Sequence, residues 1–515
     1  MDILTLLQLA GISSPLSSEE AQSVIKKLEE ISHTIVYSNS IVAKDGILYF
    51  FGRRNQEKLL GVLYSSQQQP TDFQGQQKSV TIEGKNYFLK LCPLDHNNAL
   101  GLRKALTFLQ PRLVGLRTSA GLGDRLGLAT PGHVRAARGR PLAIFFAQQS
   151  VREMARTKRT PEQVLDDATW GLFQEGWREG FGADADHLKT TEDADACIAA
   201  GFTLFTVDPS QYVDDAADSD SLSVLREKID IFPWKTLETS WETLRHDYVG
   251  KQFGAGQFSF VFDEENLLRA TVKYGQAIAH TARMYRHILE RIGKGTFELE
   301  VSVDETETPT TPLEHLFVVS ELKRLGVEWV SLAPRFVGRF EKGVDYIGNL
   351  QAFEENFTQH AAIAREFGPY KISIHSGSDK FSIYPIAART SEGLVHLKTA
   401  GTSYLEALRA VALLEPDFFR RIAVFSIGRY PQDRASYHVS AELSRLPDPR
   451  SLSDEALKEM LNQFHSREVL HVTYGSVLDK FGEQLLDVLR RDEEIYYQIL
   501  EQHIGKHLAP FSYGS

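Results

Sequence analysis

The chain has 515 residues, of which 42% are hydrophobic and 24% charged, and its formal net charge is -11. This composition predicts a soluble globular protein of about two to four compact units, and it argues against a dedicated nucleic-acid or anionic-membrane surface. The two cysteines, Cys92 and Cys197, provide no disulfide framework and fit a reducing cytoplasm, and no basic leader or membrane-spanning apolar run is present.

The first 110 residues predict a small accessory unit of mixed α and β structure. Residues 1–35 contain two short helical stretches, after which the pattern changes to short alternating strands. These strands are expected at Thr34–Val42, Ile47–Arg53, Leu59–Ser65 and Val80–Cys92. Asp45-Gly46 and Glu83-Gly84 predict turns. Nothing in this unit indicates chemistry.

From residue 112 onward, buried strands alternate with helical stretches. The strands are expected at Leu113–Arg117, Pro141–Ala147, Ala183–Thr190, Phe202–Val207, Phe297–Val303, Val327–Ala333, Lys371–His375 and Leu394–Lys398. Eight strand–helix alternations predict an α/β fold, the (β/α)8 barrel of the TIM type. An open doubly wound sheet is the alternative.

The barrel is expected to be one of three regions. Residues 1–110 form the N-terminal unit. Residues 111–445 form the catalytic barrel, with a helical insertion at about 210–290, because that segment is too long for a single crossover. Residues 446–515 form a C-terminal helical extension packed outside the barrel.

An acid and an imidazole, Asp186 and His187, fall at the end of the third expected strand. Active sites of parallel barrels lie at the carboxyl ends of the strands, and a neutral imidazole is a good ligand for zinc, manganese or iron. A single such pair is more often a solvated acid and a core histidine. His375 strengthens the metal hypothesis because it ends another expected strand. The candidates for a third ligand are Glu341, His133, His396 and His438.

The fifth expected strand carries four polar residues on one face. These residues are Glu298, Glu300, Ser302 and Asp304. A run of carboxylates inside a barrel is costly unless other charges or a metal compensate it, and the alternative is an outward, solvated face. A catalytic or ligand role is expected for at least one of them, with Glu300 preferred.

Several cations also fall at expected strand ends. They are Lys189, Lys380, Lys398, Arg125 and Arg335. Each alone is more often a surface charge, but together they indicate an anionic substrate that carries a carboxylate or a phosphate. The Gly121–Gly127 loop superficially resembles a dinucleotide-binding fingerprint, but its spacing is wrong, so a nicotinamide site is rejected.

Six longer strings between residues 110 and 445 are more specific than any of these short motifs. They are Gly123–His133, Phe146–Glu153, Asp167–Trp170, Gly182–Thr190, His375–Pro385 and Lys398–Tyr404. These strings resemble signatures of the tagaturonate/fructuronate epimerase family.

The resemblance implies a cytoplasmic isomerase that interconverts D-tagaturonate and D-fructuronate, with epimerisation of fructose to tagatose as a related activity. It implies a divalent metal (zinc, manganese, nickel, cobalt or iron) and a small ketohexuronate or ketohexose as the partner, with no nucleic acid or membrane; a homo-oligomer is left open. The residue roles it implies are Asp186 as proton acceptor, Glu300 as proton donor, and His187, Glu341 and His375 as metal ligands. The expected substrate-binding residues are Asp124, Arg125, Gln148, Lys189, Arg335, Ser376, Asp379, Lys380 and Lys398.

The chemistry of this reaction favours retro-aldol cleavage and re-addition. The inverted carbon is β to the ketone, so the carbonyl does not acidify its C–H bond, and the sequence offers no nucleotide fingerprint for transient oxidation. An Asp-His pair with a later histidine, Asp186-His187 and His375, is also similar to class II aldolases. A metal-dependent aldolase or isomerase on the same barrel is therefore the alternative, and a non-catalytic sugar-acid binding protein is a second one.

Overall fold

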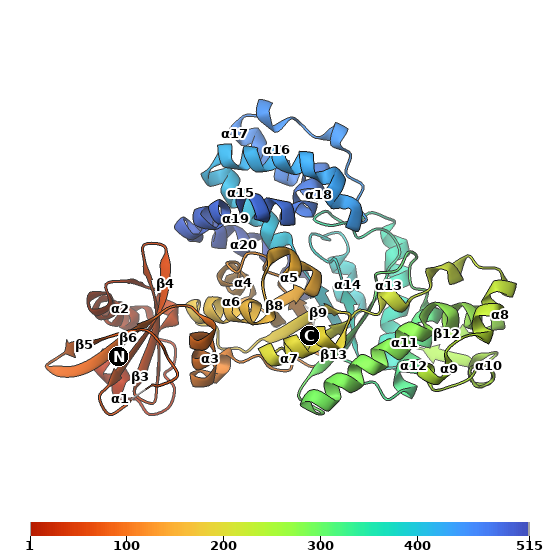
Figure 1. Ribbon diagram of the computed structural model, residues 1–515, viewed down its shortest axis with the longest axis horizontal. Helices are drawn as coiled ribbons and strands as arrows, with labels where there is room; N and C mark the ends of the chain where they lie inside the picture. Colours follow the sequence, from red (N-terminus) through yellow and green to blue (C-terminus); the bar gives the residue numbers. More distant parts are fainter. Residues whose placement is uncertain (1, 69, 513–515) are drawn as a thin grey trace.

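The computed structural model describes residues 2–68 and 70–512, with a closed barrel of eight parallel strands at its centre (Figure 1). In barrel order the strands are β7 (Ser119–Gly121), β8 (Ala143–Ser150), β9 (Gly182–Leu188), β10 (Leu204–Val207), β13 (Glu298–Val303), β14 (Ser331–Pro334), β15 (Lys371–Ile374) and β16 (Val395–Lys398). The last strand pairs with the first, His396 opposite Ser119. This closure confirms the predicted (β/α)8 barrel and excludes the open doubly wound sheet.

The first barrel strand is β7, and the predicted strand at Leu113–Arg117 was wrong. Leu113 and Leu116 are 39% and 37% exposed, whereas Ala120 in β7 is fully buried. The neighbouring strand approaches β7 closely, so that a Cβ atom on Gly121 would lie 3.1 Å from Cγ of Gln148. Small residues suit this close contact but leave no apolar alternation in the sequence, which is why the pattern placed the strand too early.

The helices packed around the barrel follow local sequence signals. They are α3 (His96–Ala105), α4 (Thr130–Ala137), α5 (Val151–Thr157), α6 (Pro161–Gln174), α7 (Thr191–Ala200), α12 (Pro312–Arg324), α13 (Leu350–Glu366) and α14 (Tyr384–Thr390). Capping boxes fix the starts of α6, α7 and α12, with Thr160, Thr190 and Thr311 as N-caps. These caps fix the points at which the chain turns from the strands into the surrounding helices.

The N-terminal unit consists of an antiparallel sheet with two helices, α1 (Ile3–Gln8) and α2 (Ser18–Ser32). The strands are β1 (Ile35–Val36), β2 (Val42–Lys44), β3 (Ile47–Arg54), β4 (Glu57–Ser65), β5 (Gln76–Ile82) and β6 (Lys85–Cys92). The predicted strand Thr34–Val42 is interrupted by a 3₁₀ turn, and the predicted strand Val80–Cys92 covers the end of the first arm, the turn and the second arm of a hairpin. The predicted turn at Glu83-Gly84 is confirmed, because both residues have positive φ.

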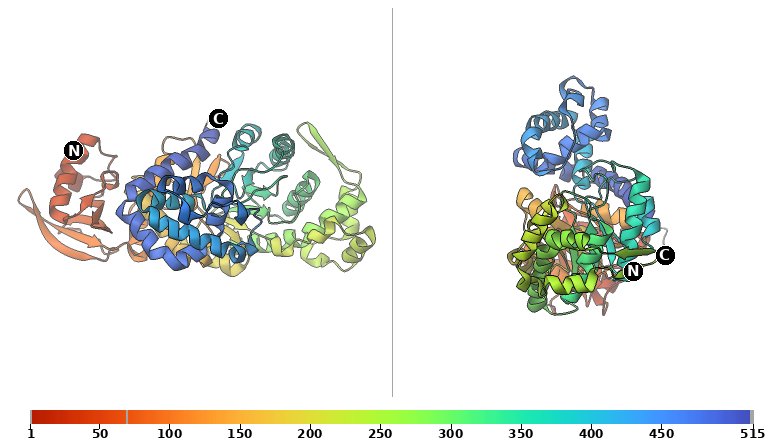
Figure 2. Two further views of the ribbon diagram at one scale, coloured as in Figure 1. Left: turned by 90° about the horizontal axis from the view of Figure 1, so that it is seen from above. Right: turned by 90° about the vertical axis from the view of Figure 1, so that its right-hand side faces the viewer.

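The insertion after β10 lies at the opposite end of the molecule from the N-terminal unit (Figures 1 and 2). It contains the helices α8 (Leu222–Asp230), α9 (Trp234–Leu237), α10 (Trp241–Tyr248) and α11 (Glu264–Ile292). It also contains an antiparallel hairpin of β11 (Gln252–Ala255) and β12 (Phe258–Val261), which the sequence analysis missed.

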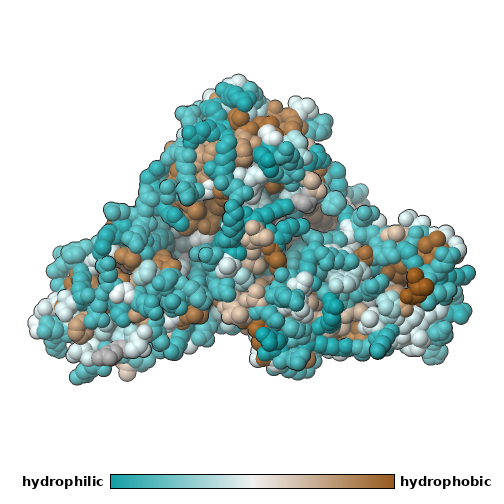
Figure 3. All heavy atoms as spheres, viewed as in Figure 1, coloured by the Kyte–Doolittle hydropathy of each residue, from teal (hydrophilic) through white to brown (hydrophobic). Residues whose placement is uncertain are grey.

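A helical unit rises above the barrel and is coloured blue in Figures 1 and 2. Its helices are α15 (Thr402–Leu414), α16 (Pro416–Asp433), α17 (Asp454–Glu459), α18 (Phe464–Val472), α19 (Tyr474–Arg491) and α20 (Glu493–Leu508). Hydrophilic residues cover most of the face shown in Figure 3, with apolar patches on this unit and on the insertion. In the described part of the chain, no helix is long and apolar enough to cross a membrane.

Candidate active site

A buried lysine joins three carboxylates at the carboxyl ends of the barrel strands. Lys398 Nζ lies 2.8 Å from Oδ2 of Asp184, 2.7 Å from Oδ1 of Asp186 and 2.7 Å from Oε1 of Glu300. Thr206 Oγ1 is a fourth partner at 2.7 Å. Burial alone would lower the pKa of Lys398, but the three carboxylates outweigh it and hold that pKa well above its usual range. Lys398 is therefore a charged internal partner that compensates the carboxylates.

The two expected catalytic carboxylates differ in their access to the cavity at this end of the barrel. Asp186 lines the cavity, and Gln148 Nε2 donates a hydrogen bond to its Oδ2 over 3.0 Å. Glu300 is fully buried in the barrel, where its Oε2 accepts a 2.5 Å hydrogen bond from Ser331 Oγ. The fifth strand therefore turns its carboxylates inward, and only Asp186 of the two is placed to touch a ligand in the cavity.

The charges around the two carboxylates keep both ionised. Burial alone would raise the pKa of Asp186, but the charges of His187 and Lys398 outweigh it and hold the pKa well below its usual range. Burial alone would also raise the pKa of Glu300, but the charges of Lys398 and His375 outweigh it and hold that pKa well below its usual range. Asp184 differs, because burial and the two neighbouring carboxylates outweigh Lys398 and raise its pKa to about 6. At neutral pH, Asp186 is thus in the form that accepts a proton.

Each of the two expected histidine ligands has one ring nitrogen held by a carboxylate. His187 Nδ1 lies 2.8 Å from Oδ1 of Asp186, and His375 Nε2 lies 2.7 Å from Oε1 of Glu300. The ring centroids are 5.0 Å apart. His375 Nδ1 is 3.0 Å from Oδ1 of Asp304 but is buried without a hydrogen bond. A carboxylate on one nitrogen fixes the ring and leaves the other nitrogen to act as a ligand, which is the usual arrangement behind metal-binding histidines.

His187, His375 and Asp304 offer ligand atoms that all lie within 4.8 Å of one another. Two imidazoles and a carboxylate suit a divalent transition metal and leave coordination positions for a substrate. His187 and Ser376 adopt left-handed backbone conformations, with φ of 57° and 49°. Non-glycine residues seldom adopt this conformation, and it is concentrated at functional sites. The residues present therefore fit a divalent cation.

Two other groups of acids and histidines are less suited to a metal. In the first, Asp379 pairs with Arg467 over 3.0 Å, and the N–H of Asp379 donates to Nε2 of His507, so that nitrogen is already engaged. The second group shares His187 and adds Asp208 and Glu305. There the ammonium of Lys189 lies 3.2 Å from Asp208. A bound side-chain cation already compensates the carboxylate in both groups.

Glu341, the expected third ligand, lies outside the cluster of His187, Asp304 and His375. Its Oε2 accepts hydrogen bonds from the backbone N–H and the hydroxyl of Ser440, at 2.8 and 2.7 Å. Of the other candidates, His133 bonds Ser403 and His396 bonds Ser119, while His438 lines the neighbouring outer cavity. The geometry favours Asp304, a member of the alternating run on the fifth strand, over all four of these residues.

The carboxyl group of Glu468 is hydrogen-bonded to that of Glu341, and this pair predicts a pH-dependent stability. Burial, followed by the hydrogen bond and charge of Glu341, raises the pKa of Glu468 from its ordinary value of 4.5 to about 8. Between these values the folded protein holds a proton that the unfolded chain has released, so stability falls as pH rises. We expect Glu468→Gln to raise the melting temperature progressively from pH 5 to pH 8 relative to the wild type. The same dependence of the melting temperature on pH in Glu468→Gln and in the wild type would contradict this prediction. The substitution Glu455→Gln, at an exposed position, serves as control.

Three of the expected substrate-binding residues line the cavity beside Asp186. They are Arg125, Ser376 and Lys398, and the cavity measures about 50 Å³. An outer cavity of about 480 Å³ shares His375, Ser376 and Asp304 with it and is also lined by Arg335. The structure thus brings four of the expected residues to one connected site.

The other expected substrate-binding residues have internal partners. Asp124 accepts hydrogen bonds from three backbone N–H groups of its own loop, which shapes the approach to α4. Lys380 Nζ donates to three backbone carbonyls, among them that of Glu341. Gln148 orients Asp186, Lys189 pairs with Asp208, and Asp379 holds Arg467, as described above. These residues position the strand-end loops and the carboxylates of the site.

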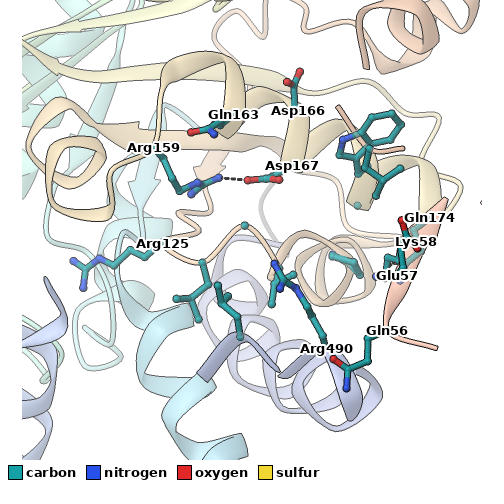
Figure 4. Close-up of a pocket in the computed structure, with 18 of the residues that line it drawn as sticks. Gln56, Glu57, Lys58, Arg125, Arg159, Gln163, Asp166, Asp167, Gln174 and Arg490 are labelled. Atoms are coloured by element: carbon teal, nitrogen blue, oxygen red, sulfur yellow. Dashed lines mark hydrogen bonds and ion pairs between the residues drawn. The ribbon is translucent and has the colours of Figure 1, made fainter. Parts of the chain in front are cut away.

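A cavity larger than these two lies elsewhere, between the N-terminal unit, α6 and the helices α19 and α20 (Figure 4). It measures about 1160 Å³, and Asp186, His187 and His375 do not line it. The close-up shows Arg125 pointing away from this space, while Arg159 pairs with Asp167 over 2.6 Å. Cavity volume alone would therefore not have led to Asp186, His187 and His375.

Among the residues of the inner cavity that escaped the sequence analysis are Arg152, Lys342 and Tyr437. Arg152 lies inside a string that carries the family resemblance, so that string was an available signal. Lys342 directly follows Glu341 in the loop after β14, and Tyr437 lies between α16 and α17. No periodic pattern marks either of them.

Comparison with known proteins identifies the family. A family model of tagaturonate epimerase (UxaE) matches residues 37–511. A tagaturonate/fructuronate epimerase of Thermotoga maritima is 45% identical over 480 residues, which cover 92% of this chain and 96% of that protein. The glycerol-complexed crystal structure of the fructuronate-tagaturonate epimerase UxaE from Cohnella laeviribosi has a TM-score of 0.87 and 37% identity, covering 96% of this chain and 99% of that chain. Its native crystal structure gives the same values. The chain therefore belongs to the tagaturonate epimerase family.

Proposed function

We propose that this protein is an isomerase that interconverts D-tagaturonate and D-fructuronate by retro-aldol cleavage and re-addition. The observation that supports this most strongly is the pair of carboxylate-held imidazoles, His187 and His375, beside the ionised Asp186 at the mouth of the barrel. Family membership supports the choice of substrate, since relatives of this chain carry the name of that activity.

The proposal includes a divalent cation (zinc, manganese, nickel, cobalt or iron) held by His187, Asp304 and His375. When bound, such a cation stabilises negative charge on substrate oxygens as a Lewis acid. Its ligands must be deprotonated, so the two imidazoles become neutral.

Asp186 begins the reaction by removing the proton from the hydroxyl on C4 of the substrate. The C3–C4 bond then breaks, its electron pair stays with C3 as an enediolate, and C4 becomes an aldehyde. The aldehyde fragment rotates, and C3 attacks its other face, so that the C3–C4 bond re-forms with inverted C4. The new alkoxide takes a proton, and no C–H bond at C4 has been broken.

Glu300, expected as the proton donor, is ionised and does not line the cavity, so it holds no proton to give and does not reach the substrate. Lys398 Nζ lies 2.7 Å from both Oδ1 of Asp186 and Oε1 of Glu300. The proton that Asp186 removes from the C4 hydroxyl therefore returns from Asp186 to the new alkoxide. Glu300 helps to keep Lys398 charged, and Asp186 is the residue that exchanges protons with the substrate.

Loss of a residue that only hydrogen-bonds a metal ligand typically weakens metal binding by roughly 10–100-fold. Asp304→Asn removes a direct ligand, so we expect it to weaken metal binding by at least that factor. Glu341→Gln is expected to leave metal affinity unchanged, because Glu341 bonds Ser440 instead. Titration of the metal-free proteins with Zn²⁺ or Co²⁺, followed by calorimetry, measures both. Weakened binding in Glu341→Gln with normal binding in Asp304→Asn would contradict this ligand assignment.

Proton NMR of D-fructuronate in D2O tests the function, with metal-loaded and chelator-treated protein compared side by side. The expected result is metal-dependent growth of D-tagaturonate signals without deuterium at C4. Deuterium at C4 would retain the epimerase and reject the retro-aldol route. Release of three-carbon products would identify an aldolase instead. If D-fructuronate is neither epimerised nor cleaved, the proposed activity on this uronate would be rejected, and D-fructose would be the next substrate to test.

A further inference from the structure

We propose that Lys342 and Arg125 form a subsite that binds the carboxylate of the substrate and thereby selects a sugar acid over a neutral sugar. This inference rests on the proposed function, because it assigns the acid group of that substrate to two residues.

The charge pairing around the inner cavity singles out Lys342. Arg152 pairs with Glu305 over 3.1 Å, and Lys398 is surrounded by three carboxylates. Within residues 2–68 and 70–512, Lys342 forms no ion pair; its Nζ donates a 2.6 Å hydrogen bond to the hydroxyl of Ser376. A hydroxyl does not neutralise an ammonium, so Lys342 is a cation in the cavity without a carboxylate in ion-pair contact among the described residues, and an anionic ligand would supply that contact.

Arg125 supplies a second, independent donor to the same cavity. The residue is 4% exposed, and its guanidinium stacks on Tyr474 with 3.8 Å from Cζ to the ring centroid. Nε donates to Glu153 over 2.8 Å and Nη2 lies 3.2 Å from Nε2 of His471, which fixes the orientation of the group. The remaining nitrogen, Nη1, is buried with no hydrogen-bond partner. An unsatisfied guanidinium N–H in a fixed position suits a carboxylate oxygen.

The size and position of the inner cavity fit one end of the substrate. A volume of about 50 Å³ holds about three to five water-sized groups, which suits a carboxylate but not a six-carbon acid. Asp186 and Asp304 line the same space, and Ser376, the partner of Lys342, directly follows His375. In the substrate the carboxylate carbon is two bonds from C4, so a carboxylate bound here leaves C4 near Asp186. The ketone end would then extend toward the outer cavity.

The expected result concerns the ratio of two dissociation constants. D-galactonate and galactitol differ in the group at one end, a carboxylate in the first and a hydroxymethyl in the second, and calorimetry with the metal-loaded protein measures binding of each without turnover. Loss of a charged hydrogen bond should raise the Kd of Lys342→Gln for D-galactonate by about 10- to 100-fold. The Kd for galactitol should change by less than about threefold, and Lys342→Arg should recover most of the preference for the acid because it keeps the charge.

The matched control is Arg335→Gln in the outer cavity, which should leave the ratio unchanged. If Arg335→Gln removes the preference for the acid and Lys342→Gln does not, the carboxylate binds in the outer cavity and the proposal is overturned. Equal weakening of both ligands in Lys342→Gln would assign Lys342 a structural role and also overturn it. Failure of the proposed function is separate, since it would appear as no conversion of D-fructuronate by the wild type.

Discussion

Replacing Asp186 with asparagine is expected to lower kcat by about 10²–10⁴-fold, the usual contribution of a general base. The amide cannot accept the substrate proton. Its oxygen can still accept the hydrogen bond that Lys398 donates to Oδ1, and its NH2 group, in place of Oδ2, can donate to Gln148 once the Gln148 amide is reversed, so the protein should remain folded. Conversion of D-fructuronate, followed by proton NMR, measures the rate, and the melting temperature reports the fold.

The matched control for this experiment is Asp184→Asn, two residues earlier on the same strand. Asp184 shares Lys398 with Asp186 but is fully buried and does not line the inner cavity. Its pKa of about 6 means that it is partly protonated near neutrality, so the amide is a close substitute. Asp184→Asn should therefore keep most of the activity. Near-normal activity in Asp186→Asn would show that another group is the base.

The substitution Lys398→Met is expected to cause the largest loss of stability, about 3–5 kcal/mol. Methionine fills a similar volume, but it leaves the carboxylates of Asp184, Asp186 and Glu300 crowded together in the barrel without their cation. Part of this cost would be recovered if one carboxyl group took up a proton. The loss should therefore be smaller at pH 5 than at pH 8, as measured by denaturant unfolding at both values.

Lys371 is the matched control because it is also fully buried inside the barrel, on the neighbouring strand β15. Burial lowers its pKa to about 8, and its Nζ bonds the hydroxyl of Ser119 over 3.0 Å. Because this lysine loses its proton readily, Lys371→Met should cost clearly less than Lys398→Met at pH 8. Equal losses for the two substitutions would mean that the three carboxylates do not depend on Lys398.

The sequence was sufficient to place the residues that end strands. Asp186, His187 and His375 could be predicted because apolar runs mark strands and the carboxyl ends of parallel strands meet at one end of a barrel. The inward face of β13 followed from its alternation, and Glu300 is indeed fully buried. Strand β7 could not be found in this way, since its small residues carry no apolar signal.

The partners of those residues could not be predicted from the sequence. Lys398 and Asp186 are 212 positions apart, and nothing in either segment indicates that the lysine turns into the barrel and not toward a substrate. Glu341 and Asp304 both follow barrel strands, so they looked equivalent as ligands. The loop after β14 brings Glu341 to Ser440 in the helical unit and so separates it from the cluster of His187, Asp304 and His375. Such loop paths depend on tertiary packing.

The packing of α20 has a consequence for how the protein forms during its synthesis. This helix packs on α4, near the start of the barrel, and Tyr496 donates a hydrogen bond to the carbonyl of Ser403. His507 accepts one from the backbone of Asp379, in the loop that follows β15. Because the ribosome makes the chain from its N-terminus, these contacts form only after residues 493–508 have emerged. A nascent chain can therefore hold all eight strands while the loop beside His375 still lacks the helix that secures it.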